Sequence, residues 1–130
     1  MLRGIRGATT VATDTPEAIA RATLEMLESI TRLNDVRTGD IAAATFSTTG
    51  DLCSAFPATS ARAMGWTLIP MLCHHEIDVP GSLALCIRVL VFWNTEKGQD
   101  EIRHVYLRDA VKLRPDLAPA LVTNNSQFEN

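Results

Sequence analysis

The chain has 130 residues, a length that predicts a single domain spanning residues 1–130. Hydrophobic residues make up 46% of it and charged residues 21%, a composition that excludes a disordered tail, a collagen-like chain and a coiled coil. The formal net charge of −3 argues against general nucleic-acid binding, whereas the predominance of Arg among the 12 basic residues leaves room for a site that binds carboxylates.

The first part of the chain predicts a strand followed by a long helix. Residues 2–11 combine Ile, Thr and Val with two Gly, which is typical of a strand. Residues 14–17 then supply a capping side chain, a Pro in the first turn and an acidic residue, which together predict a helix start. A stripe at spacings of three and four predicts a helix of about five turns that ends at residues 34–35 and is buried along Ile19, Thr23, Met26, Ile30 and Leu33.

Shorter elements follow in the middle of the chain. Residues 41–47 predict a strand, residues 48–51 a turn, and residues 56–64 a short helix closed by a glycine. Residues 66–73 predict another strand. Pro70 within it indicates an edge position or a bulge, because proline has no N–H to donate to a sheet ladder.

The last part of the chain contains its most apolar segment. Residues 83–93 predict the central strand, at least from Cys86 onward. Residues 102–113 are ambiguous between a helical turn and a strand, and the polar residues from about 118 to 130 predict a mobile tail. This order of elements predicts an α+β domain in which a mixed β-sheet packs with one long helix and short helices on one face.

Cysteine usage and charge spacing bear on the cellular compartment. The cysteines are odd in number and lack a CxxC spacing, which favours a reducing cytoplasm over a disulfide framework: Cys53, Cys73 and Cys86. Residues 1–6 contain no apolar signal-peptide core, and the longest uncharged stretch, residues 63–75, is too short to cross a bilayer. We therefore expect a soluble cytoplasmic protein that does not enter a membrane.

Two arginines occur where apolar residues are expected. Arg88 lies in the middle of the most apolar segment, where a charge is costly unless it is paired. On a strand it would share one face with Cys86, Leu90 and Phe92. A structural ion pair, an arginine that snorkels from an edge strand, or a binding role could explain it. Arg6 lies between glycines that permit close approach of a neighbouring segment or a ligand, and it could equally be a solvated strand residue.

Reactive side chains also cluster at residues 73–78, which read Cys-His-His-Glu-Ile-Asp. Neighbouring residues of a strand point to opposite faces, so this spacing is weak for a metal site, and we expect no bound metal. A thiol–imidazole pair would lack a third, orienting group. The simplest alternative is a strand end with solvated histidines. Tyr106, the only tyrosine, could be a half-buried aromatic with its hydroxyl at the rim, while Arg62 and Arg114 could be plain surface residues.

Six sequence blocks, taken together and in order, resemble a known family. They are residues 3–11, 56–58 with 65–66, 73–79, 86–89, 102–107 and 113–117. Over residues 3 to about 117 the chain resembles the monofunctional, non-helical-bundle class of chorismate mutase. The resemblance implies a homotrimer of pseudo-α/β-barrel architecture, with active sites between subunits that convert chorismate to prephenate in Phe and Tyr biosynthesis.

The resemblance also implies the site residues. The polar active-site positions are Arg6, Glu76, Arg88 and Tyr106, and the pocket and rim positions are Phe56, Arg62, Leu72, Cys73, His74, His75, Leu113 and Arg114. Arg88 would stabilise negative charge on the breaking ether oxygen, Glu76 would accept a hydrogen bond from the substrate hydroxyl, and Arg6 and Tyr106 would bind a carboxylate. Such a rearrangement needs no metal and no cofactor. Thr59 and Leu72 depart from residues found in some members of the family, which affects rim contacts.

Two other functional classes are weighed against this one. Trimeric imine deaminase-like proteins and small-carboxylate-binding proteins resemble the same architecture and also hold a carboxylate with Arg between subunits. A metal-binding or structural trimer would instead use Cys73, His74 and His75. Glu76 and the Cys-Ile-Arg block at residues 86–88 favour the mutase.

Overall fold

Helix α1 spans Pro16–Asn34 in the computed structural model, which describes residues 1–113. Its start is as predicted, because the Thr15 side chain accepts a hydrogen bond from the Ala18 N–H at 3.1 Å and Pro16 occupies the first turn. Asp35 ends the helix in a left-handed conformation with φ of 55°. The predicted tail at residues 118–130 lies outside the described residues.

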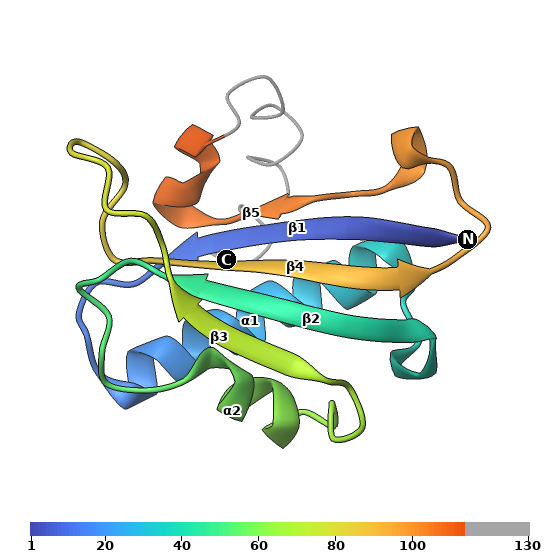
Figure 1. The fold of residues 1–130 in the computed structure, drawn as a ribbon, viewed down its shortest axis with the longest axis horizontal. Coiled ribbons are helices and arrows are strands. Elements are labelled where there is room, and N and C mark those ends of the chain that lie inside the picture. The colour runs from blue at the N-terminus through green and yellow to red at the C-terminus, as the bar shows by residue number, and fades with distance from the viewer. Residues whose placement is uncertain (114–130) are drawn as a thin grey trace.

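The strands form one five-stranded mixed sheet in the order β3-β2-β4-β1-β5 (Figure 1). The strands are β1 (Leu2–Thr10), β2 (Ile41–Thr48), β3 (Met71–His75), β4 (Cys86–Asn94) and β5 (Val105–Tyr106). Strand β4 is central, as predicted, and runs antiparallel to both β1 and β2. Strand β3 is parallel to β2 and β5 is parallel to β1, so the predicted mixed sheet is confirmed.

One predicted strand boundary is wrong. Strand β3 begins at Met71 rather than at residue 66, because the Trp66 N–H bonds to Ala61 at the end of α2 and Pro70 cannot donate to a ladder. The edge position indicated by Pro70 is confirmed. Strand β4 begins at Cys86, which confirms the prediction of a central strand at least from that residue onward; Leu85 before it has a φ of 51° and interrupts the extended backbone.

The remaining helices are short. They are α2 (Pro57–Ala63) and the 3₁₀ helices η1 (Thr38–Asp40), η2 (Gln99–Glu101) and η3 (Arg108–Leu113). The ambiguous region at residues 102–113 contains both alternatives, the short strand β5 and the helical turns of η3. None of the helices in residues 1–113 is long and apolar enough to cross a membrane.

The two faces of the sheet differ in what covers them. Helix α1 lies across one face (Figure 1), and the buried side of β4 contributes Ile87, Val89, Val91 and Trp93 to the core there. Gly7 allows this close packing, since a Cβ atom at that position would lie 2.7 Å from Ile30 Cδ1 of α1. Among residues 1–113, the opposite face is covered at its β1–β5 edge alone, where η3 packs on Ala8 and Tyr106. We call the uncovered part the open face.

Candidate active site

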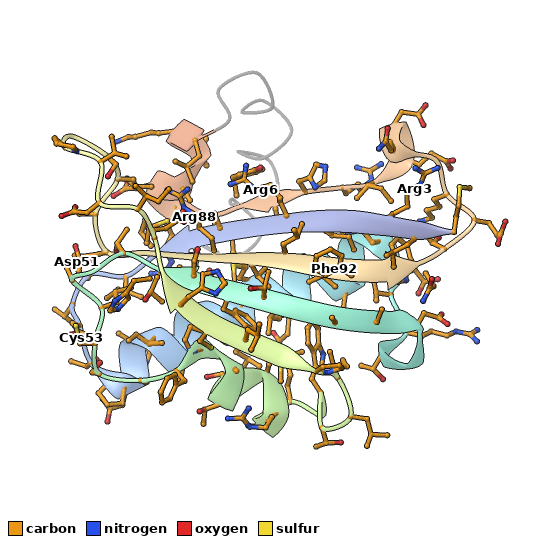
Figure 2. The ribbon with its side chains drawn as sticks, in the orientation of Figure 1. Arg3, Arg6, Asp51, Cys53, Arg88 and Phe92 are labelled. Carbon is orange, nitrogen blue, oxygen red and sulfur yellow. The ribbon has the colours of Figure 1, made fainter. Side chains whose placement is uncertain are left out.

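The strand register brings the predicted polar residues of the strands together on the sheet face opposite α1. One row crosses the sheet through His74, Ser47, Arg88, Ala8 and Tyr106, each paired with the next across a strand boundary. The adjacent row contains Leu72, Thr45, Leu90 and Arg6. Arg6 is therefore a diagonal neighbour of Arg88, at a spacing of roughly 7–8 Å between their backbones. Figure 2 shows both arginines on neighbouring strands.

Arg88 forms an ion pair with Glu76, which follows the end of β3. The Nη1–Oε2 distance is 2.7 Å, and the two side chains are 24% and 28% exposed. The ion pair raised as an explanation of Arg88 from the sequence is therefore confirmed. Pairs with this much solvent contact contribute only about 0–1 kcal/mol to stability, so the pair alone does not account for an arginine in this strand.

The guanidinium of Arg88 retains unused hydrogen-bonding capacity. Its Nε atom is buried and has no hydrogen-bond partner within residues 1–113. A buried donor without a partner is costly, and such groups in folded proteins call for a functional explanation. The open face above Arg88 is hollowed to about 180 Å³, lined by Arg6, His74, Glu76, Arg88 and residues of β2 and β4. A ligand in this hollow could satisfy the donor.

Arg6 and Tyr106 lie on the other side of Arg88. The Arg6 guanidinium carbon is 5.6 Å from the centre of the Tyr106 ring, a cation–π distance. Tyr106 is fully buried beneath η3 rather than half-buried, and its hydroxyl has no partner among the described residues. Leu113, at the end of η3, packs against the same small cluster. Arg114 lies outside the described residues.

Cys86 borders the site at the start of β4 and shares a face with Arg88, as predicted. Burial raises the pKa of its thiol above the ordinary value of 9.0, and the neighbouring Arg88 opposes that shift only in part. The thiol therefore stays protonated near neutral pH. A neutral thiol adds no negative charge beside Arg88. Within residues 1–113, Glu76 is the one acidic group seen in contact with Arg88.

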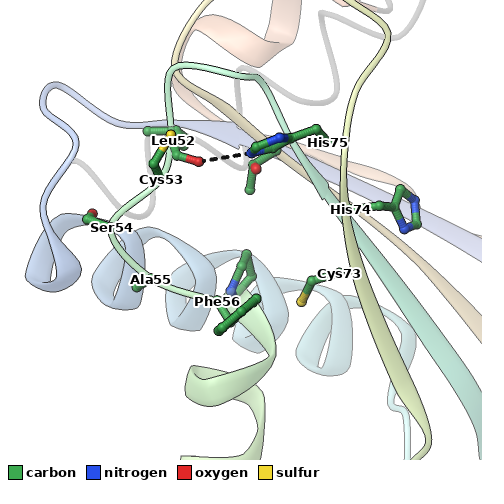
Figure 3. A pocket seen from close by; sticks show the side chains of 10 residues that line it. Leu52, Cys53, Ser54, Ala55, Phe56, Cys73, His74 and His75 are labelled. Atoms are coloured by element: carbon green, nitrogen blue, oxygen red, sulfur yellow. Dashed lines mark hydrogen bonds between the residues drawn. The ribbon is translucent and has the colours of Figure 1, made fainter.

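A second group of predicted residues lies apart from Arg88. Phe56, Cys73 and His75 line a different hollow of about 440 Å³ between β3 and the segment before α2 (Figure 3). Phe56 is 68% exposed, and the nearby Arg62 of α2 is also exposed and donates a long hydrogen bond of 3.4 Å to the Thr59 hydroxyl. The structure thus divides the predicted residues between two surfaces of the chain.

The histidines lie at this division. His74 and His75 point to opposite sides of β3, and His75 Nε2 is 3.4 Å from the Leu52 carbonyl oxygen (Figure 3). Both are exposed at the end of the strand, as the simplest interpretation of the sequence predicted. Within residues 1–113 no three His, Cys, Asp or Glu side chains converge in a group that could hold a metal ion.

Four residues that line the hollow beside Arg88 were missed from the sequence: Thr45, Ser47, Val89 and Leu90. Thr45 and Ser47 have small polar side chains that leave space over the guanidinium, and Leu90 supplies an apolar wall between Arg6 and Arg88. Nothing in the local sequence marks Thr45 or Ser47, because their place beside Arg88 depends on the pairing of β2 with β4.

The chemistry of this arrangement is that of an anion site. Two guanidinium groups and one carboxylate give it a local excess of positive charge, and the unpartnered Nε donor of Arg88 lies beside the hollow of about 180 Å³. Comparison with known proteins identifies the family. The profile of the family described as "Chorismate mutase type I" matches residues 2–117. The chain belongs to the chorismate mutase type I family.

Individual relatives in this chorismate mutase family are similar along nearly their whole length. The chain is 54% identical to chorismate mutase AroH of Thermus thermophilus over 121 residues, which covers 92% of this chain and 99% of that protein. It is 45% identical to chorismate mutase AroH of Bacillus subtilis (strain 168) over 129 residues, covering 98% and 99%. Among solved structures, a chorismate mutase from Clostridium thermocellum matches with a TM-score of 0.82 at 46% identity, covering 83% of this chain and 96% of that one.

Proposed function

We propose that this chain catalyses the rearrangement of chorismate to prephenate at the open-face hollow around Arg88. The observation that carries the proposal is the Arg88 guanidinium, held by Glu76 on one side and left with an unpartnered buried donor beside the hollow. The match of nearly the whole chain to the chorismate mutase type I family supports it. The same match favours this activity over that of an imine deaminase-like or carboxylate-binding protein.

In the reaction, an ether C–O bond breaks while a C–C bond forms within the same molecule, so no proton, electron or leaving group is exchanged with the enzyme. Negative charge grows on the ether oxygen as its bond breaks. A fixed guanidinium at that oxygen stabilises the transition state more than the ground state. Arg88 meets this requirement because its strand is central and its ion pair with Glu76 orients the group in advance.

The other polar groups of the open face would bind and orient the substrate. Arg6 lies in the adjacent row and can pair with a substrate carboxylate, and the Tyr106 hydroxyl can donate a hydrogen bond to it. Glu76 has a second carboxylate oxygen with which to accept a hydrogen bond from the substrate hydroxyl. Fixing both ends of the substrate selects the compact, chair-like conformer in which the reacting carbons are close.

We further propose that the enzyme is a homotrimer of pseudo-α/β-barrel architecture, with each site completed by a neighbouring subunit. The open-face hollow of about 180 Å³ is smaller than a usual ligand pocket of about 300–1,000 Å³, so one subunit provides only part of the walls. Apolar side chains are strongly exposed on and beside this face, including Leu72 at 71% and Ile77 at 85%. The residues around Phe56 and Arg62 are the candidates for the second wall.

Turnover is tested by following the loss of chorismate absorbance, with and without exhaustive chelation. We expect equal rates in both samples, since every proposed role is filled by a side chain. A rate that falls on chelation and returns with one added metal would contradict the electrostatic mechanism.

The free thiols of the three cysteines fit an enzyme that works in the cytoplasm.

The shared site is tested by mixing two variants that are altered on opposite walls, Arg88→Ala and Arg62→Ala. Random mixed trimers at equal ratio would restore both walls in about a quarter of the sites, so activity should exceed the sum of the separate variants. Suppose that one variant carries an affinity tag and pull-down shows that mixed trimers have formed. Activity no greater than that sum would then show that both residues act in one subunit. A fully active monomer would contradict the trimer.

A further inference from the structure

The segment from Thr48 to Asp51, at the end of β2, is bonded to the backbone of Glu76 and to that of Cys86, two residues before Arg88. The Thr48 carbonyl oxygen accepts a hydrogen bond from the Glu76 N–H at 2.8 Å. Thr49 bonds Cys86 twice: its N–H donates to the Cys86 carbonyl at 3.0 Å, and its hydroxyl accepts from the Cys86 N–H at 2.9 Å. The loop between Glu76 and Cys86 is therefore attached to this one segment at its two ends.

Asp51 adds a further contact at the start of β4. One oxygen of its carboxylate accepts a hydrogen bond from the Leu85 N–H at 3.0 Å, and the other accepts from the Thr49 hydroxyl. Leu85 is the residue with a φ of 51°, a left-handed conformation that a leucine adopts only where its surroundings impose it. The Asp51 side chain thus bonds directly to Leu85, the strained residue that precedes the start of β4.

We propose that Thr49 and Asp51 are positioning residues that fix the start of β4 and so hold Arg88 in its catalytic orientation. Arg88 is two residues beyond Cys86, on the same face of the same strand. A shift in the backbone at Leu85 and Cys86 therefore moves the guanidinium relative to Glu76 and to the substrate. The proposal rests on the proposed function, because it assigns these residues a role in that reaction.

The role is carried by hydrogen bonds rather than by the negative charge of Asp51. An asparagine at this position would keep one oxygen to accept from the Leu85 N–H. Its NH₂ group could donate to the Thr49 hydroxyl oxygen, which would replace the present bond from that hydroxyl to Asp51 by one of opposite direction. Alanine would lose both bonds. Valine in place of Thr49 would remove the hydroxyl at nearly unchanged shape, whereas serine would keep it.

The test compares these variants in steady-state turnover of chorismate, well below their melting temperatures. Misplacement of a catalytic group by as little as about 1 Å can cost roughly 100-fold, so we expect Asp51→Ala and Thr49→Val each to lower kcat roughly 10-fold or more, with a smaller change in KM. Asp51→Asn and Thr49→Ser should remain within about threefold of the wild type. The Asp51→Ala/Thr49→Val double variant should be little worse than either alone, since both break one unit.

A matched control is Glu101→Ala. Glu101 also accepts a hydrogen bond from a loop N–H, that of Gly98 at 2.9 Å, but in η2, at the end of the sheet away from Arg88. It should leave kcat unchanged. Wild-type turnover by itself tests the proposed function, and the ratios between variants test the positioning role.

Three results would overturn the proposal. The first is a folded Asp51→Ala with kcat within threefold of the wild type. The second is Asp51→Asn as slow as Asp51→Ala, which would mean that charge matters rather than hydrogen bonding. The third is an equal loss in Glu101→Ala, which would indicate general loosening of the fold. If Asp51→Ala does not fold, the comparison of Thr49→Val with Thr49→Ser decides, because equal kcat in those two variants excludes the role.

Discussion

Replacing Arg88 with alanine separates a catalytic role from a structural one. The substitution removes the Nη1 contact to Glu76 and the unpartnered Nε donor beside the hollow. Loss of one preorganised donor to a developing oxyanion costs roughly 10²–10³ in kcat, about 3–4 kcal/mol, and loss of the whole cation costs at least that. We therefore expect Arg88→Ala to be nearly inactive.

The effect on stability should be far smaller. The ion pair is 24% and 28% exposed, so its removal should cost about 0–1 kcal/mol, and Glu76 can be hydrated in its absence. For a chain of this length that corresponds to a fall of roughly 3–5 °C or less in Tm. Arg88→Lys should also be slow, because an ammonium on a shorter stem lacks the planar fork of the guanidinium.

Both quantities should be measured on the same sample, kcat from the loss of chorismate absorbance and Tm from thermal unfolding. Arg3→Ala is a matched control, because Arg3 is also a half-buried arginine of the sheet but bonds the Lys97 carbonyl at 3.0 Å, far from the site (Figure 2). It should keep wild-type kcat. A well-folded Arg88→Ala with near-normal kcat would remove Arg88 from the mechanism, and a variant that is unfolded at the assay temperature would assign Arg88 a structural role.

Three further outcomes follow from individual side chains. Hydrogen bonds from the Ser54 hydroxyl and then the Cys53 N–H lower the pKa of Asp14 below its ordinary value of 3.8. The Tm of the wild type should therefore exceed that of Asp14→Ala by the full amount near neutral pH, and the difference should vanish as pH falls through the lowered pKa. A difference in Tm that does not depend on pH would refute this. Tyr106→Phe should raise KM or lower kcat with little change in Tm, since the hydroxyl has no partner within residues 1–113; a large fall in Tm would contradict it. Burial and a raised pKa should keep Cys86 unmodified by a thiol reagent until the protein unfolds, while exposed Cys53 reacts first, as mass spectrometry of labelled peptides can show.

Local sequence signals were sufficient for the elements that short-range physics specifies. The capping residues and the apolar stripe of α1 act within a few turns of the same helix, so its bounds could be predicted closely. The apolar run around Arg88 likewise predicted the central strand and marked the arginine as anomalous. The left-handed conformation of Leu85 was not predictable in this way, since it is imposed by bonds from residues far away in the chain.

The composition of the site was only partly accessible from the sequence. The family resemblance named Arg6, Glu76, Arg88 and Tyr106, and the structure brings these four to one region on the side of the sheet opposite α1. It also places Cys73 on the other side of β3, beside Phe56. That separation depends on the alternation of side chains along β3, an edge strand whose start was predicted at residue 66 but lies at Met71.

By itself the sequence determined the α+β class, the central strand, the charged residue within it and, through ordered motifs, the family. Only the tertiary structure decided that Ser47 and Ala8 flank Arg88, that Tyr106 is fully buried beneath η3, and that Thr49 and Asp51 bond the start of β4. The physical reason is the range of the interactions. Helix caps and apolar periodicity act between residues a few positions apart, whereas strand register joins segments 27 residues apart or more, as in the pair Ala44 and Met71, and is set only when the whole sheet has formed.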